Sequence, residues 1–239
     1  MNVIKFIPSH NILNTDYLTT KPESIKKHIP LWYKQSESTF FSKKTGQVED
    51  GGLKTCMSFL DTFLTGYCLV TPFDIFVDKN DDGSLNIRWN GPNEYSQFVH
   101  ERDHDQASKL PRPFGCAPNP LIWKSEWGWK TKRGWSSLCV HPMNRYDLPF
   151  VTLNGIIDTD KFFGNGNMPF FIKEDFIGMI PKGTPYMQII PFQRKSWQSY
   201  VDASLTPNIT LQGIELREMP DPDKNKSYKK FFWMKKDYR

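Results

Sequence analysis

Residues 168–192, MPFFIKEDFIGMIPKGTPYMQIIPF, decide the expected fold of this chain. Three apolar runs, at 168–172, 176–180 and 186–192, are separated by Lys-Glu-Asp and by a Pro-Lys-Gly-Thr-Pro turn. Short runs rich in β-branched and aromatic residues, with turn residues between them, are typical of antiparallel strands. The stretch therefore predicts a mainly β protein.

Runs of the same kind continue toward the N-terminus. Asn80-Asp-Asp-Gly83, followed by an alternating run, predicts a hairpin whose second strand is at 85–89. Strands spaced by roughly ten residues are typical of an antiparallel barrel or double sheet of the β-clip or jelly-roll kind. Further strands are expected at 3–7, 67–70, 74–77, 121–129, 136–141 and 151–157.

We expect one or two short helices near the N-terminus. Residues 21–33, KPESIKKHIPLWY, suggest a helix with Pro22 in its first turn and Pro30 at its end. Residues 54–64 suggest a second short helix or a strand. The polar, Gly-containing stretch 40–52 is expected to be a loop.

The organisation that we predict has three parts. Residues 1–52 form an N-terminal extension with a short strand and helix, residues 53–200 form the β core, and residues 201–239 form a C-terminal extension. Within the core, residues 91–120 are polar and rich in His, Asp and Pro, which predicts a long surface loop.

Composition excludes several classes of protein. Aromatic residues make up 15% of the 239 residues, alongside 18 Pro and 15 Gly, which argues against a helical bundle, a coiled coil or a disordered chain. The most apolar stretch, 57–77, is interrupted by Asp61, Pro72 and Asp74, so we expect no membrane span and no membrane partner. Residues 1–11 do not resemble a secretory signal.

The four cysteines have no CxxC spacing. We expect free, buried thiols in a reducing compartment, which predicts a cytoplasmic location; the cysteines are Cys56, Cys68, Cys116 and Cys139.

The positive charge is concentrated in the last residues. The formal net charge is +5, and residues 224–239 hold seven Lys and Arg against Asp237, which leaves the rest of the chain nearly neutral. We expect apolar rings of this tail to dock on the protein while the lysines stay in water; these rings are Phe231, Phe232 and Trp233. The alternative is a nucleic-acid partner, bound only through this tail by stacking on Tyr228, Trp233 and Tyr238.

The histidines allow a metal site. His100-Glu-Arg-Asp-His104 matches HExxH, but the flanking residues carry no apolar stripe, so a helix there would be solvated and its ligands poorly fixed. The expected structure is a solvated loop, with a metal or substrate contact by His100, His104 and Asp105 as the alternative. A cupin-type site could combine His100 or His104 with His141 and Asp158.

Three segments resemble the middle motifs of the trimeric dUTPase and dCTP deaminase superfamily. They are GWSSL at 134–138, LNGIIDTD at 153–160 and IPKGTPYMQIIPFQR at 180–194. The resemblance implies a β-clip fold and a pocket for a nucleotide. It implies phosphate contacts by Ser136 and Ser137, a base pocket lined by Gly155 and Ile157, a sugar or water contact by Asp158, and a phosphate-side strand with Gln188.

The chain departs from that family pattern at three places. Cys68 stands where a metal-associated Asp is expected, Trp135 replaces the Arg of the first segment, and the C-terminal Gly-rich phosphate-closing segment is absent. A triphosphate needs several cationic or backbone donors. Binding of a nucleotide-like molecule without assured hydrolysis is therefore the preferred interpretation.

The chain as a whole resembles a domain family of unknown function found in tailed bacteriophages, notably marine and cyanobacterial ones, and in some bacteria. The residues that carry this resemblance are IPLWYK at 29–34, TGYCLVTPFDIFV at 65–77, HPMNRYDLPFVTLNGIIDTD at 141–160 and KGTPYMQIIPFQRKSW at 182–197. The resemblance implies a phage origin and a location in the host cytoplasm or the virion, and no particular reaction.

Two further groups of residues have open interpretations. Arg145 can pair with Asp158 or Asp160, either to fix a corner of the barrel or to face a ligand. A group of tryptophans is expected in the core or at a subunit interface, with a stacking platform as the alternative; its members are Trp123, Trp127, Trp129 and Trp135.

Three functions fit these residues. The first is a nucleotide-like ligand site that includes Ser136, Ser137, Arg145, Asp158, Asp160 and Gln188. The second is a phage structural or host-interaction protein with no catalytic site, and the third is a metal-dependent, cupin-type enzyme that uses His100, His104 and His141. A homo-oligomer is expected.

Overall fold

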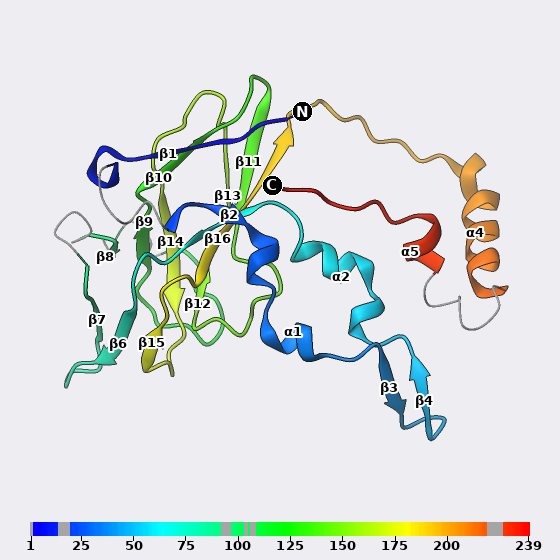
Figure 1. Cartoon of the computed structure of the whole chain (residues 1–239), viewed down its shortest axis with the longest axis horizontal. Helices are drawn as coiled ribbons and strands as arrows, with labels where there is room; N and C mark the ends of the chain where they lie inside the picture. Colours follow the sequence, from blue (N-terminus) through cyan, green and yellow to red (C-terminus); the bar gives the residue numbers. More distant parts are fainter. Residues whose placement is uncertain (1, 14–19, 92–96, 103–104, 106–108, 219–226) are drawn as a thin grey trace. The chain divides into compact units, whose positions relative to one another are not determined.

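The computed structural model describes the whole chain except residues 1, 14–19, 92–96, 103–104, 106–108 and 219–226 (Figure 1). It divides the chain into two compact units. The first contains Met1–His28, Gly66–Arg194 and Arg239, and the second contains Ile29–Thr65 and Lys195–Tyr238.

The first unit is built from antiparallel sheets. The largest has five strands in the order β13 (Gly155–Ile157), β11 (Trp135–Val140), β16 (Pro185–Gln193), β5 (Tyr67–Val70) and β2 (Glu23–Ser24). The strand β13 is therefore at one edge of this sheet, with β11 as its neighbour.

Three smaller sheets complete the first unit. Four strands follow the order β12 (Phe150–Thr152), β14 (Asn167–Ile172), β9 (Leu121–Lys124) and β8 (Val99–Glu101). Three strands follow the order β15 (Gly178–Ile180), β6 (Ile75–Lys79) and β7 (Leu85–Trp89), and β1 (Lys5–Pro8) pairs with β10 (Trp127–Lys130). Short 3₁₀ turns are present at η1 (His10–Ile12) and η3 (Ile25–His28).

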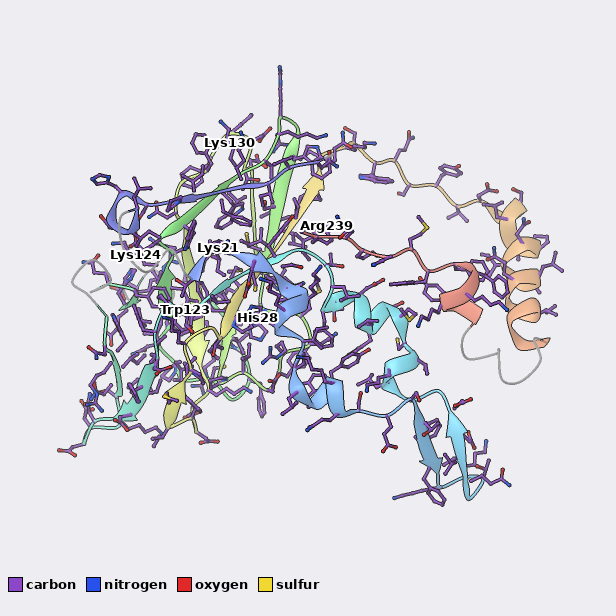
Figure 2. All side chains as sticks on the ribbon, viewed as in Figure 1. Lys21, His28, Trp123, Lys124, Lys130 and Arg239 are labelled. Carbon is purple, nitrogen blue, oxygen red and sulfur yellow. The ribbon has the colours of Figure 1, made fainter. Side chains whose placement is uncertain are left out.

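Aromatic rings fill the core of the first unit. Trp123, labelled in Figure 2, is fully buried and stacks on Phe170, with ring centroids 3.7 Å apart. Phe150 and Tyr186 contact the same indole at centroid distances of 5.2 and 5.3 Å. Each fully buried aromatic side chain stabilises the fold by roughly 2–3 kcal/mol through removal of its apolar surface from water.

The second unit contains most of the helices. Its elements are α1 (Leu31–Gln35), β3 (Thr39–Ser42), β4 (Gln47–Asp50), η4 (Leu53–Thr55), α2 (Met57–Thr62), η6 (Ala203–Leu205), α4 (Thr206–Glu218) and α5 (Ser227–Phe231). Four rings from α1, α2 and the residue after α2 pack together at centroid distances between 5.0 and 6.3 Å: Trp32, Tyr33, Phe59 and Phe63.

The predicted fold class is confirmed, because the structure is mainly β and its paired strands are antiparallel. The strands at 67–70 and 85–89 have the predicted bounds, and the Asn80–Gly83 turn joins β6 to β7 as expected. The described strands form separate sheets, and none of these sheets closes into a barrel.

Three local predictions are wrong. Residues 21–33 form β2 and η3 instead of one helix, and Pro30 caps the start of α1 because its fixed φ suits the residue before a first turn. The stretch 40–52, expected to be a loop, contains the hairpin of β3 and β4. The 91–120 loop contains β8, which pairs with β9 beside the buried Phe98. The C-terminal extension, for which we predict no secondary structure, contains α4 and α5.

The predicted core and thiols are confirmed in part. Trp123 and Trp129 are buried, so the stacking platform is wrong for these two rings. Cys56, which directly precedes α2, is exposed, contrary to expectation. The other three cysteines are buried free thiols, and burial raises the pKa of Cys68 and that of Cys139, the latter to about 12.

None of the helices in the described part of the chain has the length and apolar character that a membrane-spanning segment requires.

Candidate functional site

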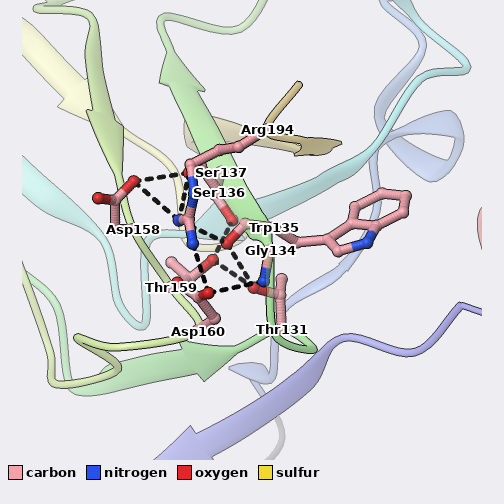
Figure 3. Close-up of polar contacts among 9 residues, drawn as sticks. All are labelled: Thr131, Gly134, Trp135, Ser136, Ser137, Asp158, Thr159, Asp160 and Arg194. Carbon is pink, nitrogen blue, oxygen red and sulfur yellow. Dashed lines mark hydrogen bonds and ion pairs between the residues drawn. The ribbon is translucent and has the colours of Figure 1, made fainter. Parts of the chain in front are cut away.

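A polar cluster lies at the start of β11, beside the ends of β13 and β16 (Figure 3). We call it the Asp158 cluster. Its members are Thr131, Gly134, Trp135, Ser136, Ser137, Asp158, Thr159, Asp160 and Arg194.

Strand register brings these distant residues together. Ser137 pairs with Ile157, so the residues that follow β13 lie next to the first residues of β11. Trp135 pairs with Gln193 on the other side, so Arg194 lies next to Gly134, and the backbone N–H of Arg194 donates to the Gly134 carbonyl at 2.8 Å.

Asp158 presents an ionised carboxylate to solvent. Its Oδ1 accepts a hydrogen bond from the Ser136 hydroxyl at 2.7 Å and lies 3.0 Å from Nη1 of Arg194. The hydrogen bond from Ser136, together with the charge of Arg194, lowers the pKa of Asp158. The side chain nevertheless remains 55% exposed, so the carboxylate can accept further hydrogen bonds from a ligand.

Asp160 is the buried counterpart of Asp158. Its side chain is only 5% exposed, and its Oδ2 accepts from the Gly134 N–H at 2.8 Å and from Nη2 of Arg194. These hydrogen bonds, Arg194 first, lower the pKa of Asp160 to about 2. Its other oxygen, Oδ1, has no hydrogen-bond partner among the described residues. Asp160 therefore holds Arg194 and the backbone of Gly134 in place within the cluster.

Arg194 connects the two carboxylates, and sequence reasoning missed it. Nη1 contacts the Ser136 hydroxyl at 2.9 Å, the Trp135 carbonyl at 3.2 Å and Asp158, while Nη2 pairs with Asp160. Figure 3 shows the guanidinium reaching between the two carboxylates. The resembling segment 180–194 ends at this arginine, but the resemblance assigns it no role, and its contacts depend on the pairing of β16 with β11.

Hydroxyl groups form a buried layer next to the carboxylates. The Thr159 hydroxyl lies 2.8 Å from that of Thr131 and 3.0 Å from that of Ser137. Ser136 and Ser137 are fully buried, so in this conformation Ser136 supports Asp158 and Ser137 bonds within the protein. The phosphate contacts implied for these two serines therefore stay a prediction.

Basic side chains are exposed around the cluster. Lys132 and Arg133 lie in the turn that leads into β11, and Lys161 directly follows Asp160. The Lys132 ammonium lies 5.1 Å from the centre of the Trp135 ring and 2.6 Å from the Asn2 side-chain oxygen. Three cations therefore surround two carboxylates and Arg194, which gives this end of the sheet a net positive charge.

Gln188, Arg145 and His141 belong to a different group at the far end of β11. Gln188 is paired with Val140, and its Oε1 accepts from the Met143 N–H at 2.9 Å. Ser136 and Val140 are four residues apart on the same strand, a distance of about 13 Å at 3.3 Å per residue. Gln188 therefore lies away from the Asp158 cluster, and a single ligand site that includes both stays a prediction.

Arg145 does not pair with Asp158 or Asp160, so that prediction is wrong. Its guanidinium forks onto Asp147, with Nε and Nη2 each 2.9 Å from a carboxylate oxygen, and Nη1 donates to the His28 carbonyl at 3.2 Å. A partner two residues away satisfies the fork locally, which leaves the other carboxylates to Arg194.

The proposed metal ligands are only partly described. His104 lies outside the described residues, and His100 lies on β8, where it pairs with Ile122. His141 uses both ring nitrogens: Nε2 donates to the Arg145 carbonyl at 3.1 Å, and Nδ1 accepts from the Thr152 N–H at 3.3 Å. Burial lowers the pKa of His141. Among the residues that the structure describes, no three His, Cys, Asp or Glu side chains are grouped to hold a metal ion.

A separate groove of about 280 Å³ lies between β7 and β8. Apolar and polar residues share its walls, and the Asp158 cluster is not part of it; the lining residues are Leu85, Asn86, Ile87, Trp89, Val99, His100, Glu101 and Leu121.

Comparison with known proteins gives little further information. No family model matches the chain, and no curated protein matches it, so the resemblance to the phage family gains no support. Among solved structures, the native dUTPase of EIAV is similar with 12% sequence identity over 58% of this chain and 85% of that chain. The TM-score is 0.30, which is too low for any conclusion about this protein.

Proposed function

We propose that the chain binds a nucleotide-like small molecule at the Asp158 cluster. The observation that carries the proposal is the Asp158 carboxylate, which is exposed, ionised and held in one orientation by Ser136 and Arg194. A carboxylate fixed in this way accepts a hydrogen bond from a hydroxyl group, such as one on a sugar ring. In this proposal, the Asp158 carboxylate binds the sugar of the ligand.

The edge of β13 provides the contacts for a base. β13 is an edge strand, and edge strands present backbone donors and acceptors that suit the polar edge of a planar base. The Ile156 side chain is 65% exposed, and the space above Gly155 is open to at least 4 Å. A base lying there contacts both the backbone and an apolar side chain.

The surrounding cations favour an anionic group on the ligand. Lys132, Arg133 and Lys161 are exposed within two residues of the hydrogen-bonded members of the cluster. Exposed lysine and arginine side chains bind phosphate by charge and multiple donors. A phosphorylated sugar with a base therefore matches the three parts of this surface.

The proposal includes binding and omits hydrolysis. Cys68 is fully buried with a raised pKa, so its thiol stays neutral and cannot replace a carboxylate. Trp135 provides no cation where the resembled family has arginine. These differences remove the charges that a reacting phosphate chain requires.

Calorimetric titration tests the proposal. The probes are deoxyuridine and deoxyuridine mono- and triphosphate, added to the wild-type chain, to Asp158→Asn and to Asp82→Asn. Asp82 is the matched control because its Oδ1 also accepts from a serine hydroxyl, that of Ser84, in a distant turn. We expect Asp158→Asn to weaken binding at least about tenfold, since a charged hydrogen bond is lost, and Asp82→Asn to bind like the wild type. Absence of binding to the wild type, or equal binding by Asp158→Asn, would overturn the proposal.

We also propose that a second copy of the chain covers part of this edge, in keeping with the expected homo-oligomer. Phe162 and Phe163 are exposed in the segment that follows β13, and such apolar side chains favour a protein interface. Native mass spectrometry that shows only monomer at micromolar concentration would contradict this part.

A further inference from the structure

The C-terminal segment Ser227–Tyr238 combines exposed rings with lysines. Tyr228 is 48% exposed and Phe231 is 55% exposed, and Phe232 is similarly accessible. Lys229, Lys230, Lys235 and Lys236 lie between or beside these rings, against the single acidic residue Asp237. Aromatic and cationic side chains therefore alternate over a short stretch.

Two residues of this segment, Trp233 and Lys236, bind Asp61 of the second unit. The Trp233 indole N–H lies 3.0 and 3.1 Å from the two carboxylate oxygens of Asp61, on α2. Lys236 forms an ion pair with the same carboxylate at 3.1 Å. Of the three rings expected to dock, only Trp233 is held in this way, while Phe231 and Phe232 remain about half exposed.

The exposed rings are arranged for stacking. Tyr228 and Phe232 lie one above the other at α5, with centroids 6.3 Å apart and planes inclined by 27°. The Lys230 ammonium lies 5.2 Å from the centre of the Phe231 ring. The contact of Trp233 with Asp61 orders the segment that carries these rings and lysines. Less conformational entropy is therefore lost when a ligand binds.

We propose that Ser227–Tyr238 is a binding site for single-stranded nucleic acid. Unpaired bases stack on Tyr228, Phe231 and Phe232, and the phosphates contact Lys229, Lys230 and Lys235. Single strands fit better than duplex DNA because stacking on a side chain requires an unpaired base. A membrane surface fits less well, since α5 has five residues and does not provide the large apolar face of an interfacial helix.

Fluorescence anisotropy on the full-length chain tests this site. The probe is a labelled 20-nucleotide oligo-dT, and the variants are Tyr228→Ala with Phe232→Ala, and Lys229→Gln with Lys230→Gln. The controls are Phe41→Ala and Lys43→Gln with Lys44→Gln, which change an exposed ring and exposed lysines on the β3–β4 hairpin.

The aromatic pair and the lysine pair should each weaken binding about tenfold or more, and the controls should bind like the wild type. With three lysines on phosphates, log K should fall with log salt concentration at a slope of about −2. Absence of binding by the wild type would overturn the proposal, as would equal binding by the aromatic variant, which would leave a charge effect only. Preference for vesicles of anionic phospholipid over the oligonucleotide would also overturn it.

The result is independent of the nucleotide site. Asp158→Asn should bind the oligonucleotide like the wild type, because Asp158 belongs to the first unit and the tail to the second. Loss of oligonucleotide binding in Asp158→Asn would show that the strand binds at the Asp158 cluster instead and would contradict the tail site.

Discussion

At the residue scale, Arg194 is the side chain on which the Asp158 cluster depends. It contacts both carboxylates, the Ser136 hydroxyl and the Trp135 carbonyl. These bonds raise the pKa of Arg194 further, Asp160 contributing first, so the guanidinium stays charged. Without it, two carboxylates would lie next to each other with no cation between them.

Arg194→Gln should raise the pKa of Asp160 from about 2 toward its usual value of 3.8. A carboxyl group whose pKa is lowered by folding stabilises the fold above its unfolded pKa, and this stabilisation disappears as the pH falls from about 3.8 to about 2. Arg194→Gln should lose the part of the free energy of unfolding that depends on pH through Asp160. Titration of carboxyl ¹³C resonances measures it, with Arg88→Gln as the control because Arg88 pairs with Asp78 elsewhere. An unchanged Asp160 pKa in Arg194→Gln would disprove the ion pair.

His141 should also make the stability of the fold depend on pH, through burial of its ring and not through an ion pair. Burial lowers the pKa of this histidine below its usual 6.5, so folding favours the neutral ring. The stabilisation is complete above pH 6.5 and decreases as the pH falls below it, because the unfolded chain takes up the proton first. Urea unfolding at about pH 7.5 and about pH 5.5 should show a smaller pH difference for His141→Asn than for the wild type. Equal differences would show that the ring is not buried as described.

Sequence reasoning identifies some residues of the site and misses others. The motif resemblance groups Ser136 with Asp158, and the structure brings these side chains within hydrogen-bond distance. It also includes Gln188, which lies at the other end of the strand. The role of Arg194 could not be predicted. Arg194 follows β16 and Gly134 precedes β11, and only the register of these two strands shows that the residues are neighbours.

At the element scale, the pairing of β11 with β13 and β16 builds the site. Short apolar runs with turn residues predict these strands, since alternation and turn chemistry are local properties. The order of strands in the sheet is not local, and neither is β8, whose three residues are stabilised by pairing with β9. Pro30 also shows the limit of local rules, because proline both ends one helix pattern and starts another.

Gly66 offers a direct test of the sheet around β5. Its φ is +88°, and an added Cβ would lie 2.3 Å from the Ile189 carbonyl oxygen on β16. Gly66→Ala should lower the free energy of unfolding by about 3 kcal/mol, from backbone strain together with the steric clash. Gly83→Ala is the control, because its φ is +81° with nothing within 4 Å, and strain alone should cost about 1 kcal/mol. Urea denaturation measures both; equal losses would contradict the close approach of β5 and β16.

At the scale of the whole molecule, the chain consists of a β unit with an aromatic core and a second unit rich in short helices. Composition predicts the first, because a high aromatic content with many Pro and Gly favours strands and turns. The second unit combines residues 29–65 with 195–238, and no composition shift marks a pairing between segments so distant in the chain.

The core of the β unit should depend strongly on Trp123. Trp123→Ala removes a fully buried ring that stacks on Phe170 and should cost about 3–5 kcal/mol of unfolding free energy. Trp123→Phe should cost clearly less, because the indole N–H has no hydrogen-bond partner among the described residues and its removal leaves no acceptor unpaired. Thermal and urea unfolding measure the difference. If both variants lost the same stability, the indole N–H would have a partner that the geometry does not show.

The binding site at the Asp158 cluster is the central claim, and NMR mapping tests it most directly. Deoxyuridine monophosphate is added to ¹⁵N-labelled protein while the backbone amide shifts are followed. We expect the largest changes at Gly134–Ser136 and Gly155–Lys161, where the carboxylates, the edge strand and the basic side chains lie. No changes at saturating probe, or changes confined to the groove between β7 and β8 or to the second unit, would contradict the claim.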